Sequence, residues 1–208
     1  MEQRRDSATA YIILADGFET IEALTPLDVL RRCGVEVTTI SLNKTRAVRS
    51  SHGVTVEADA TMEDFMHNCN CSASGTGTGT STNASSAVRQ ALILPGGYPG
   101  YKNLCESAEV GALITQFHKE GKLLCAICGA PTALKANQIC RGAAITCHTS
   151  VKEELSDYYS ILSSAVVKYM NIITGMGAGR SLEFAFAIAE ALTSKEKVEE
   201  IKAKMEII

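Results

Sequence analysis

The stretch AYIILADGFETIEALTPLDVLRRCGVEVTTIS, residues 10–41, holds a strand, a helix and a second strand in close succession. Residues 10–15 form a short apolar run with β-branched side chains, which is typical of a buried strand. Apolar residues then recur at helical spacing over 21–30, and Gly34 stands where a helix-ending glycine belongs. Residues 35–41 predict the second strand. Strand, helix and strand within about thirty residues is the size of a βαβ unit.

The alternation of strands and helices continues to the end of the chain. It predicts an α/β sandwich with a mostly parallel central sheet and helices on both faces. In such folds, function gathers at the carboxyl ends of the strands. Further strands are predicted at 91–97, 122–127, 143–148 and 165–175, the last with a short edge hairpin, and helices around 110–117, from 131 and over 181–192.

Composition and charge limit the class of protein. The chain has 208 residues, of which 46% are hydrophobic and 21% charged, as expected for one globular domain. A net charge of −3 and a pI near 5.8 disfavour a nucleic-acid or membrane-surface binder, which would carry a basic patch. No apolar run approaches the ~18 residues that span a bilayer, and the N-terminus lacks the apolar core of a secretory signal. These features predict a cytoplasmic protein with reduced cysteines.

Two segments are expected to lie outside the core of a single domain that spans 1–208. Residues 1–9 precede the first apolar run and are predicted to be a flexible N-terminus. Residues 68–87, NCNCSASGTGTGTSTNASSA, are rich in Gly, Ser and Thr and are predicted to be a low-complexity surface loop insert. Between these segments, residues 46–59 predict a short hairpin that turns around His52.

Cys128 lies between the predicted strand 122–127 and a helix that begins near Pro131. A sharp strand-to-helix turn presents its central side chain to the open crevice, as in a nucleophile elbow, and the small Gly129 allows the turn to close. The helix N-terminus is expected to lower the pKa of the thiol and favour the thiolate. Two alternatives stay open, a buried structural cysteine and a C-x-x-C redox pair with Cys125.

Five motifs occur in a characteristic order: ILADGFETIEALTPLDVLRRCGVEV, ALILPGG, LLCAICGAPTAL, TCHTS and GAGRSLEFAFAIAEAL. Together they resemble the DJ-1/ThiJ/PfpI superfamily, in the branch of the parkinsonism-associated protein and its bacterial relatives. The resemblance runs from about residue 10 to 203 and is interrupted by the 68–87 insert. It implies a flavodoxin-like three-layer sandwich, usually a homodimer, that uses no organic cofactor and no metal.

The resemblance also assigns the site. The nucleophilic, oxidation-sensitive cysteine falls on Cys128, its acidic partner on Glu22 rather than Glu19, and its histidine on His148. Physical chemistry agrees, because a carboxyl beside a thiolate is expected to stay protonated and donate a hydrogen bond to sulfur, and a histidine can move protons near neutral pH. The backbone amides that hold an anion or oxyanion fall on Gly96, Gly97 and Gly129.

The implied activity is that of a glyoxalase III or protein deglycase, a hydro-lyase or hydrolase. Its substrates would be small reactive aldehydes such as methylglyoxal or glyoxal, with their early thiol and amine adducts, and its products 2-hydroxy acids. The alternative is a non-enzymatic oxidative-stress sensor or redox-regulated chaperone that acts through oxidation of Cys128. A protease is disfavoured because Gly129, not histidine, follows the nucleophile, and a glutamine amidotransferase because TCHTS lacks the His-x-Glu motif.

Two positions depart from the pattern of the branch. His52 and Met176 stand where arginines often occur. This leaves open how an anion would be recognised at the pocket mouth, and Arg49 or Arg180 are the candidates to compensate.

Overall fold

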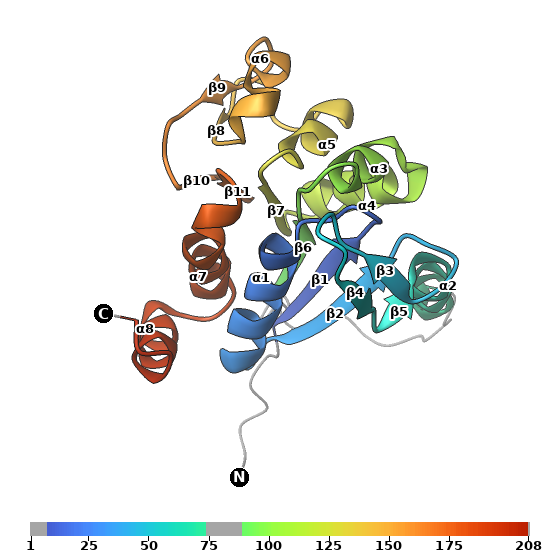
Figure 1. Cartoon of the computed structure of the whole chain (residues 1–208), viewed down its shortest axis with the longest axis horizontal. Helices are drawn as coiled ribbons and strands as arrows, with labels where there is room; N and C mark the ends of the chain where they lie inside the picture. The colour runs from blue at the N-terminus through green and yellow to red at the C-terminus, as the bar shows by residue number, and fades with distance from the viewer. Residues whose placement is uncertain (1–7, 74–88, 208) are drawn as a thin grey trace, which may run out of the picture.

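The computed structural model describes residues 8–73 and 89–207, and at its centre lies a seven-stranded sheet (Figure 1). Neighbouring strands are parallel except β10 and β11, which form the predicted antiparallel edge hairpin. The inner order β2-β1-β6-β7-β11 is the flavodoxin-like order. Across the sheet the strands are β10 (Val166–Tyr169), β11 (Ile172–Gly175), β7 (Leu123–Ile127), β6 (Gln90–Leu94), β1 (Thr9–Leu14), β2 (Glu36–Ser41) and β5 (Ala60–Thr61).

Helices cover both faces of this sheet, and α1 lies beside α7 (Figure 1). The predicted three-layer sandwich with a mostly parallel sheet is therefore confirmed. One helical layer contains α1 (Thr20–Arg32), α7 (Ser181–Leu192) and α8 (Lys195–Lys204), and the other contains α2 (Met62–Ala73), α3 (Gly100–Glu106), α4 (Ala108–Lys119) and α5 (Pro131–Ala136).

The core alternates between the two layers because successive side chains of a strand point to opposite faces. In β7, Leu124 and Ala126 pack with α4 and α5, whereas Cys125 and Ile127 pack with α1 and α7. All four side chains are fully buried. Burial on both faces explains why the strands read as continuous apolar runs in the sequence.

The first βαβ unit forms as predicted. Helix α1 begins after Glu19, whose carboxylate caps the helix by accepting the N–H of Glu22 at 2.8 Å. It continues through the buried Pro26 and ends at Cys33, and Gly34 follows in the left-handed region with φ +80°.

Both segments predicted to lie outside the core begin or end differently in the structure. The predicted flexible N-terminus, 1–9, is wrong at its end, because Thr9 opens β1 and Ala8 is buried; residues 1–7 lie outside the described residues. The predicted loop 68–87 is wrong at its start, because α2 continues to residue 73. No glycine or proline interrupts the helix before Gly75. The remainder of that predicted loop, 74–87, lies outside the described residues.

The predicted strand 143–148 is only partly correct. It shortens to β8 (Ala144–Ile145), which pairs with β9 (Ser160–Ile161) away from the central sheet. The N–H of Thr146 donates instead to the Thr174 hydroxyl at 2.9 Å. His148 then caps a short 3-10 turn, η1 (Thr149–Val151), which leads into α6 (Lys152–Leu155).

The hairpin predicted over 46–59 is confirmed as β3 (Ala47–Arg49) and β4 (Thr55–Glu57). Its tip lies against the loop between β1 and α1, where the N–H of Ser51 donates to the carbonyl of Phe18 at 2.8 Å. The hairpin is therefore attached next to the start of α1.

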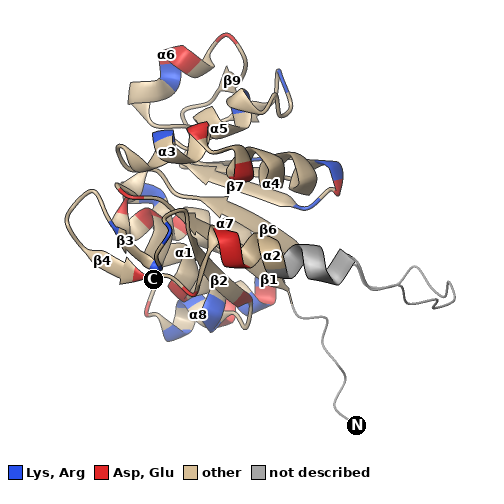
Figure 2. Ribbon diagram, turned by 90° about the vertical axis from the view of Figure 1, so that its right-hand side faces the viewer, with Lys and Arg blue, Asp and Glu red and all other residues tan. Residues whose placement is uncertain are grey.

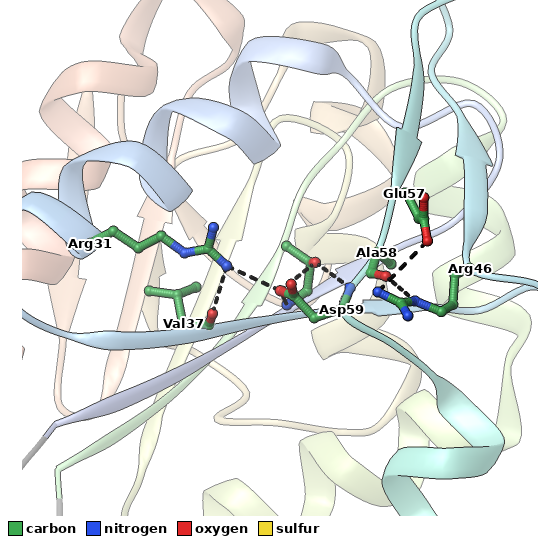
Figure 3. A network of polar contacts seen from close by, with 7 residues as sticks. Arg31, Val37, Arg46, Glu57, Ala58 and Asp59 are labelled. Atoms are coloured by element: carbon green, nitrogen blue, oxygen red, sulfur yellow. Dashed lines mark hydrogen bonds and ion pairs between the residues drawn. The ribbon is translucent and has the colours of Figure 1, made fainter.

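The base of the hairpin is attached through Asp59 (Figure 3). Its Oδ2 accepts hydrogen bonds from the N–H and the hydroxyl of Thr39, both at 2.8 Å, and from the Arg31 guanidinium at 3.1 Å. Arg31 also donates to the Val37 carbonyl at 3.0 Å. One carboxylate thus connects the hairpin, β2 and α1.

Charged residues of both signs occur along the chain, as on α8 (Figure 2). There Lys197 and Lys204 both pair with Glu200, at 2.8 and 2.6 Å, and Lys202 pairs with Glu199 at 2.9 Å. Across 8–73 and 89–207, no helix has both the length and the apolar character needed to cross a membrane.

Candidate active site

All the predicted site residues except His148 lie at the carboxyl ends of three adjacent strands, β1, β6 and β7. Cys128 follows β7, Gly96 and Gly97 follow β6, and Glu22 lies in the first turn of α1, which follows β1. The strand order reverses between β1 and β6, and such a switch point opens a crevice in a doubly wound sheet. Chain topology therefore brings these residues together from distant parts of the sequence.

Cys128 occupies the turn between β7 and α5, as the elbow interpretation predicted. Its φ is +65°, which is rare for a residue with a side chain. The backbone is held on both sides, because the N–H of Cys128 donates to the Gly175 carbonyl and its own carbonyl accepts the N–H of His148, both at 2.9 Å. The half-buried thiol is thus directed by a left-handed turn that its neighbours fix in place.

Glu22 is fully buried beside this thiol. Burial raises the pKa of its carboxyl to about 7; hydrogen bonds with Cys128 and the Gly96 N–H oppose the rise, and the charge of Glu19 adds to it. Oε2 accepts the N–H of Gly96 at 2.8 Å, whereas Oε1 is buried without a conventional hydrogen bond to any described residue. A carboxyl in this position exchanges its proton near neutral pH.

The missing side chain of Gly96 leaves room for the carboxyl and the thiol to approach each other. A Cβ at this position would lie 2.6 Å from both the Cys128 Cβ and the Glu22 Oε2, and 3.1 Å from the sulfur. The two distances of 2.6 Å are shorter than real Cβ contacts, so this arrangement of the acid and the thiol requires a glycine.

The expectation of a lowered thiol pKa is wrong for this geometry. Burial, followed by the charge and hydrogen bond of Glu22, raises the pKa of the Cys128 thiol to about 12, although the N–H groups of Gly97 and Gly129 lower it. Helix α5 has only six residues. Its short dipole is outweighed by desolvation and by the adjacent carboxylate. The thiol therefore keeps its proton until a base accepts it, and Glu22 is adjacent.

The three candidate anion-binding glycines divide into two roles. The N–H groups of Gly97 and Gly129 interact with the sulfur of Cys128. The N–H of Gly96 is instead occupied by Glu22. We therefore assign Gly96 to holding the carboxyl, a correction to its expected role, and retain Gly97 and Gly129 as candidate oxyanion donors.

His148 lies on the exposed side of the site. Its Nδ1 accepts the N–H of Ser150 at 3.2 Å and lies 2.8 Å from the Ser150 hydroxyl. Because Nδ1 acts as an acceptor, the neutral ring carries its proton on Nε2. The hydrogen bond that joins His148 to Cys128 is made by the backbone. The backbone thus links His148 to the nucleophile, while its imidazole ring bonds to Ser150.

The sequence did not identify Glu19 or Tyr101 as parts of this region. Glu19 caps α1 and raises the pKa of Glu22 by its charge. The ring of Tyr101 lies against Gly129, since a Cβ on that glycine would be 2.7 Å from the Tyr101 Cδ1. The Glu-x-x-Glu spacing of FETIE is a signal that could have indicated the cap. The packing of the Tyr101 ring on Gly129 leaves no signal in the local sequence.

The structure bears on both alternative interpretations of Cys128, a redox pair with Cys125 and a buried structural cysteine. Cys125 is fully buried within β7, and burial raises the pKa of its thiol. Six cysteines in the described ranges are free thiols, Cys125 and Cys128 among them. Cys128, by contrast, is half-buried and has an acid partner, which does not fit a purely structural cysteine.

The structure also places the two positions that depart from the branch pattern, His52 and Met176, and the candidate Arg180. His52 lies 3.9 Å from the Glu19 carboxylate and its side chain is 74% exposed. Arg180 pairs with Glu183 at 2.9 Å. Met176 is half-buried, and its N–H donates to the Ala165 carbonyl at 3.0 Å. Within residues 8–73 and 89–207, no group of three or more His, Cys, Asp or Glu side chains is placed to hold a metal ion.

A family model described as DJ-1/PfpI matches residues 8–191, a range that includes every residue of this site. The chain belongs to the DJ-1/PfpI family. Protein dj-1beta of Drosophila melanogaster is 36% identical over 196 residues, which cover 94% of this chain and 95% of that protein. The Parkinson disease protein 7 homolog of Danio rerio is 34% identical, with 94% and 95% covered.

Other family members add a functional name and the fold. The glutathione-independent glyoxalase DJR-1.2 of Caenorhabditis elegans is 31% identical over 180 residues, which cover 86% of this chain and 85% of that protein. The crystal structure of Drosophila melanogaster DJ-1beta superposes with a TM-score of 0.83 at 35% identity, with 97% of this chain and 99% of that chain covered. The family thus includes a member named as an enzyme.

Proposed function

We propose that this protein is a cysteine-dependent glyoxalase III or deglycase that converts small 2-oxoaldehydes, methylglyoxal among them, and their early thiol and amine adducts to 2-hydroxy acids. The observation that carries the proposal is the pair of Glu22 and Cys128, which face each other across Gly96. A carboxyl with a pKa of about 7 beside a protonated thiol is suited to accept its proton during attack. The glyoxalase name of one relative adds support.

The proposed reaction needs no external oxidant or reductant. The Cys128 sulfur adds to the aldehyde carbon while the thiol proton passes to Glu22, and the N–H groups of Gly97 and Gly129 stabilise the oxyanion. A proton then moves from the aldehyde carbon to the neighbouring carbonyl carbon, with Glu22 and His148 as acid and base. This oxidises the first carbon, reduces the second and gives a thioester. Water releases the 2-hydroxy acid and restores the thiol.

A direct assay tests this function. Purified protein should consume methylglyoxal and release lactate. Cys128→Ser should abolish turnover, and Glu22→Gln should lower it by about 10²-fold or more, as expected for loss of a general base. Cys105→Ser, which changes another described free thiol outside the site, serves as the matched control. Turnover that survives in Cys128→Ser would contradict the proposal.

A sensor function is the second candidate, favoured by the same contacts. The amides of Gly97 and Gly129 and a protonated Glu22 would also hold a sulfinate on Cys128. If the wild type shows no turnover and peroxide adds two oxygens at Cys128 alone, the sensor function is correct.

On the family resemblance we also propose that the protein is a cytoplasmic homodimer. Light scattering would test the dimer, and cell fractionation would test the localisation.

A further inference from the structure

Two tyrosines lie next to the amides that interact with the Cys128 sulfur. Tyr98 directly follows Gly97, and Tyr101 packs its ring on Gly129. The two rings are 6.4 Å apart between centroids and inclined by 56°. Neither tyrosine has a part in the reaction proposed above.

The backbone that carries these rings is held rigidly. A Cβ on Gly97 would lie 2.3 Å from the Glu19 nitrogen, and one on Gly100 would lie 2.6 Å from the Phe18 nitrogen. The N–H of Tyr101 also donates to the Gly97 carbonyl at 2.9 Å. Because the turn is packed this closely against the loop before α1, the tyrosines keep a fixed position relative to the Gly97 N–H.

Most of the Tyr98 ring is open to solvent. The residue is 67% exposed, which is high for a large aromatic side chain. Lys102 places its Nζ 5.4 Å from the ring centroid, so one cation already interacts with this ring. Tyr98 therefore presents aromatic surface to solvent one residue from the Gly97 N–H, which contacts the sulfur.

We propose that Tyr98 and Tyr101 form an aromatic wall beside the sulfur and that the site therefore selects 2-oxoaldehydes with an aryl substituent, such as phenylglyoxal, over the methyl compound. The inference rests on the proposed function and assigns its substrate class. An aldehyde carbon bound to Cys128, with its oxygen on Gly97 and Gly129, directs the substituent of the second carbon toward the neighbouring rings. Aromatic pairs at centroid distances of about 4.5–7 Å are favourable. Phenylglyoxal and water would give mandelate, with both carbons changing oxidation state inside one molecule.

The test compares kcat/KM for phenylglyoxal and methylglyoxal in each variant. The ratio of the two values cancels any effect that a substitution has on the reactivity of the thiol toward both substrates. Tyr98→Ala should lower the ratio about five- to tenfold, the effect of one aromatic contact, and Tyr98→Phe should retain the wild-type ratio. Tyr169→Ala is the matched control, because Tyr169 is 38% exposed and pairs with Ile172 at the opposite end of the sheet.

Two results would contradict the proposed role of the aromatic wall in substrate selection. One is an unchanged ratio in Tyr98→Ala, and the other is an equal loss in Tyr169→Ala. A wild type that turns over neither aldehyde would contradict the proposed function instead. In that event, protection of Cys128 from iodoacetamide still measures reversible adduct formation. The wall then predicts that Tyr98→Ala weakens protection by phenylglyoxal about five- to tenfold more than protection by methylglyoxal, and equal weakening would overturn it.

Discussion

The Glu22 carboxyl and the Cys128 thiol are joined across the backbone of Gly96, whose N–H donates to Glu22 at 2.8 Å and whose missing side chain leaves the space for their contact. The carboxyl is fully buried, and burial raises its pKa to about 7. The same glycine thus orients the acid and admits it to the thiol. Several measurable properties of the protein depend on this arrangement.

Gly96→Ala should separate the acid from the thiol. The new methyl group would lie 2.6 Å from both partners, so one of them must move. We expect a loss of about 1–3 kcal/mol in the free energy of unfolding, as for an overpacked core, with at least a tenfold slower turnover of methylglyoxal. Urea unfolding and kinetics measure the two effects. Gly179→Ala is the control, because a Cβ there meets no atom within 4 Å; equal behaviour of the two variants would disprove the role of Gly96.

Glu22→Gln should change how stability depends on pH. The folded carboxyl keeps its proton up to a pKa of about 7, whereas the unfolded carboxyl releases it near 4.5. Between these values unfolding releases a proton, so this group's contribution is present at low pH and is lost as pH rises through 7. The stability difference between Glu22→Gln and wild type should therefore shift by about 3 kcal/mol in favour of the variant from pH 4.5 to pH 8. Urea unfolding at both pH values measures this shift, and a constant difference would show that Glu22 has an ordinary pKa.

Asp59→Ala should loosen the base of the hairpin shown in Figure 3. Thr39 is buried, and its N–H would lose its acceptor, which costs about 1–3 kcal/mol. Glu57→Ala is the control: Glu57 is 75% exposed and 3.8 Å from Arg46, so its loss should cost under about 0.5 kcal/mol. Urea unfolding measures both, and equal losses would contradict the network.

The effect of Asp59→Ala should also become smaller in acid. Burial tends to raise the pKa of Asp59, but the hydrogen bonds from Thr39 and the charges of Arg31 and Arg46 lower it below its ordinary 3.8. The ionised group therefore stabilises the fold above pH 3.8, and this contribution is lost as pH falls through the lowered value. A difference between Asp59→Ala and wild type that persisted unchanged well below that pH would show that charge is unimportant here.

Cys125→Ala should leave the chemistry of Cys128 intact. Cys125 is fully buried in the core, so its loss should cost about 1 kcal/mol of stability and alter turnover by less than about twofold. Mass spectrometry of peroxide-treated wild type should find oxygen added at Cys128 and no disulfide between residues 125 and 128. A loss of two hydrogens across this pair, absent from Cys125→Ala, would restore the redox-pair interpretation.

The fold was largely predictable because strand and helix patterns are local. Residues 10–41 gave the first βαβ unit, and Gly34 marked the end of its helix correctly. The strand predicted at 143–148 was only partly correct because the N–H of Thr146 donates to the Thr174 side chain, a long-range contact. The loop prediction was wrong over 68–73 because small polar residues resemble a loop in composition yet allow the helix that begins at Met62 to continue.

The site was predictable in its members but less so in its electrostatics. The motifs indicated Cys128 and Glu22, and the structure brings the two together. The direction of the thiol pKa was wrong, since burial is set by packing on every side and cannot be read from the turn alone. The N–H of Gly96 was assigned to an anion, whereas the buried carboxyl already occupies it.

The left-handed backbone of Cys128, with φ +65°, has a consequence for how this protein can be engineered. A side chain in that conformation costs about 1–2 kcal/mol relative to glycine. Selection for thermal stability alone would therefore favour a glycine at residue 128. The resulting protein would be more stable but would lack its nucleophile. Screens for robust variants should retain an activity step, because at this position the most stable residue and the working residue differ.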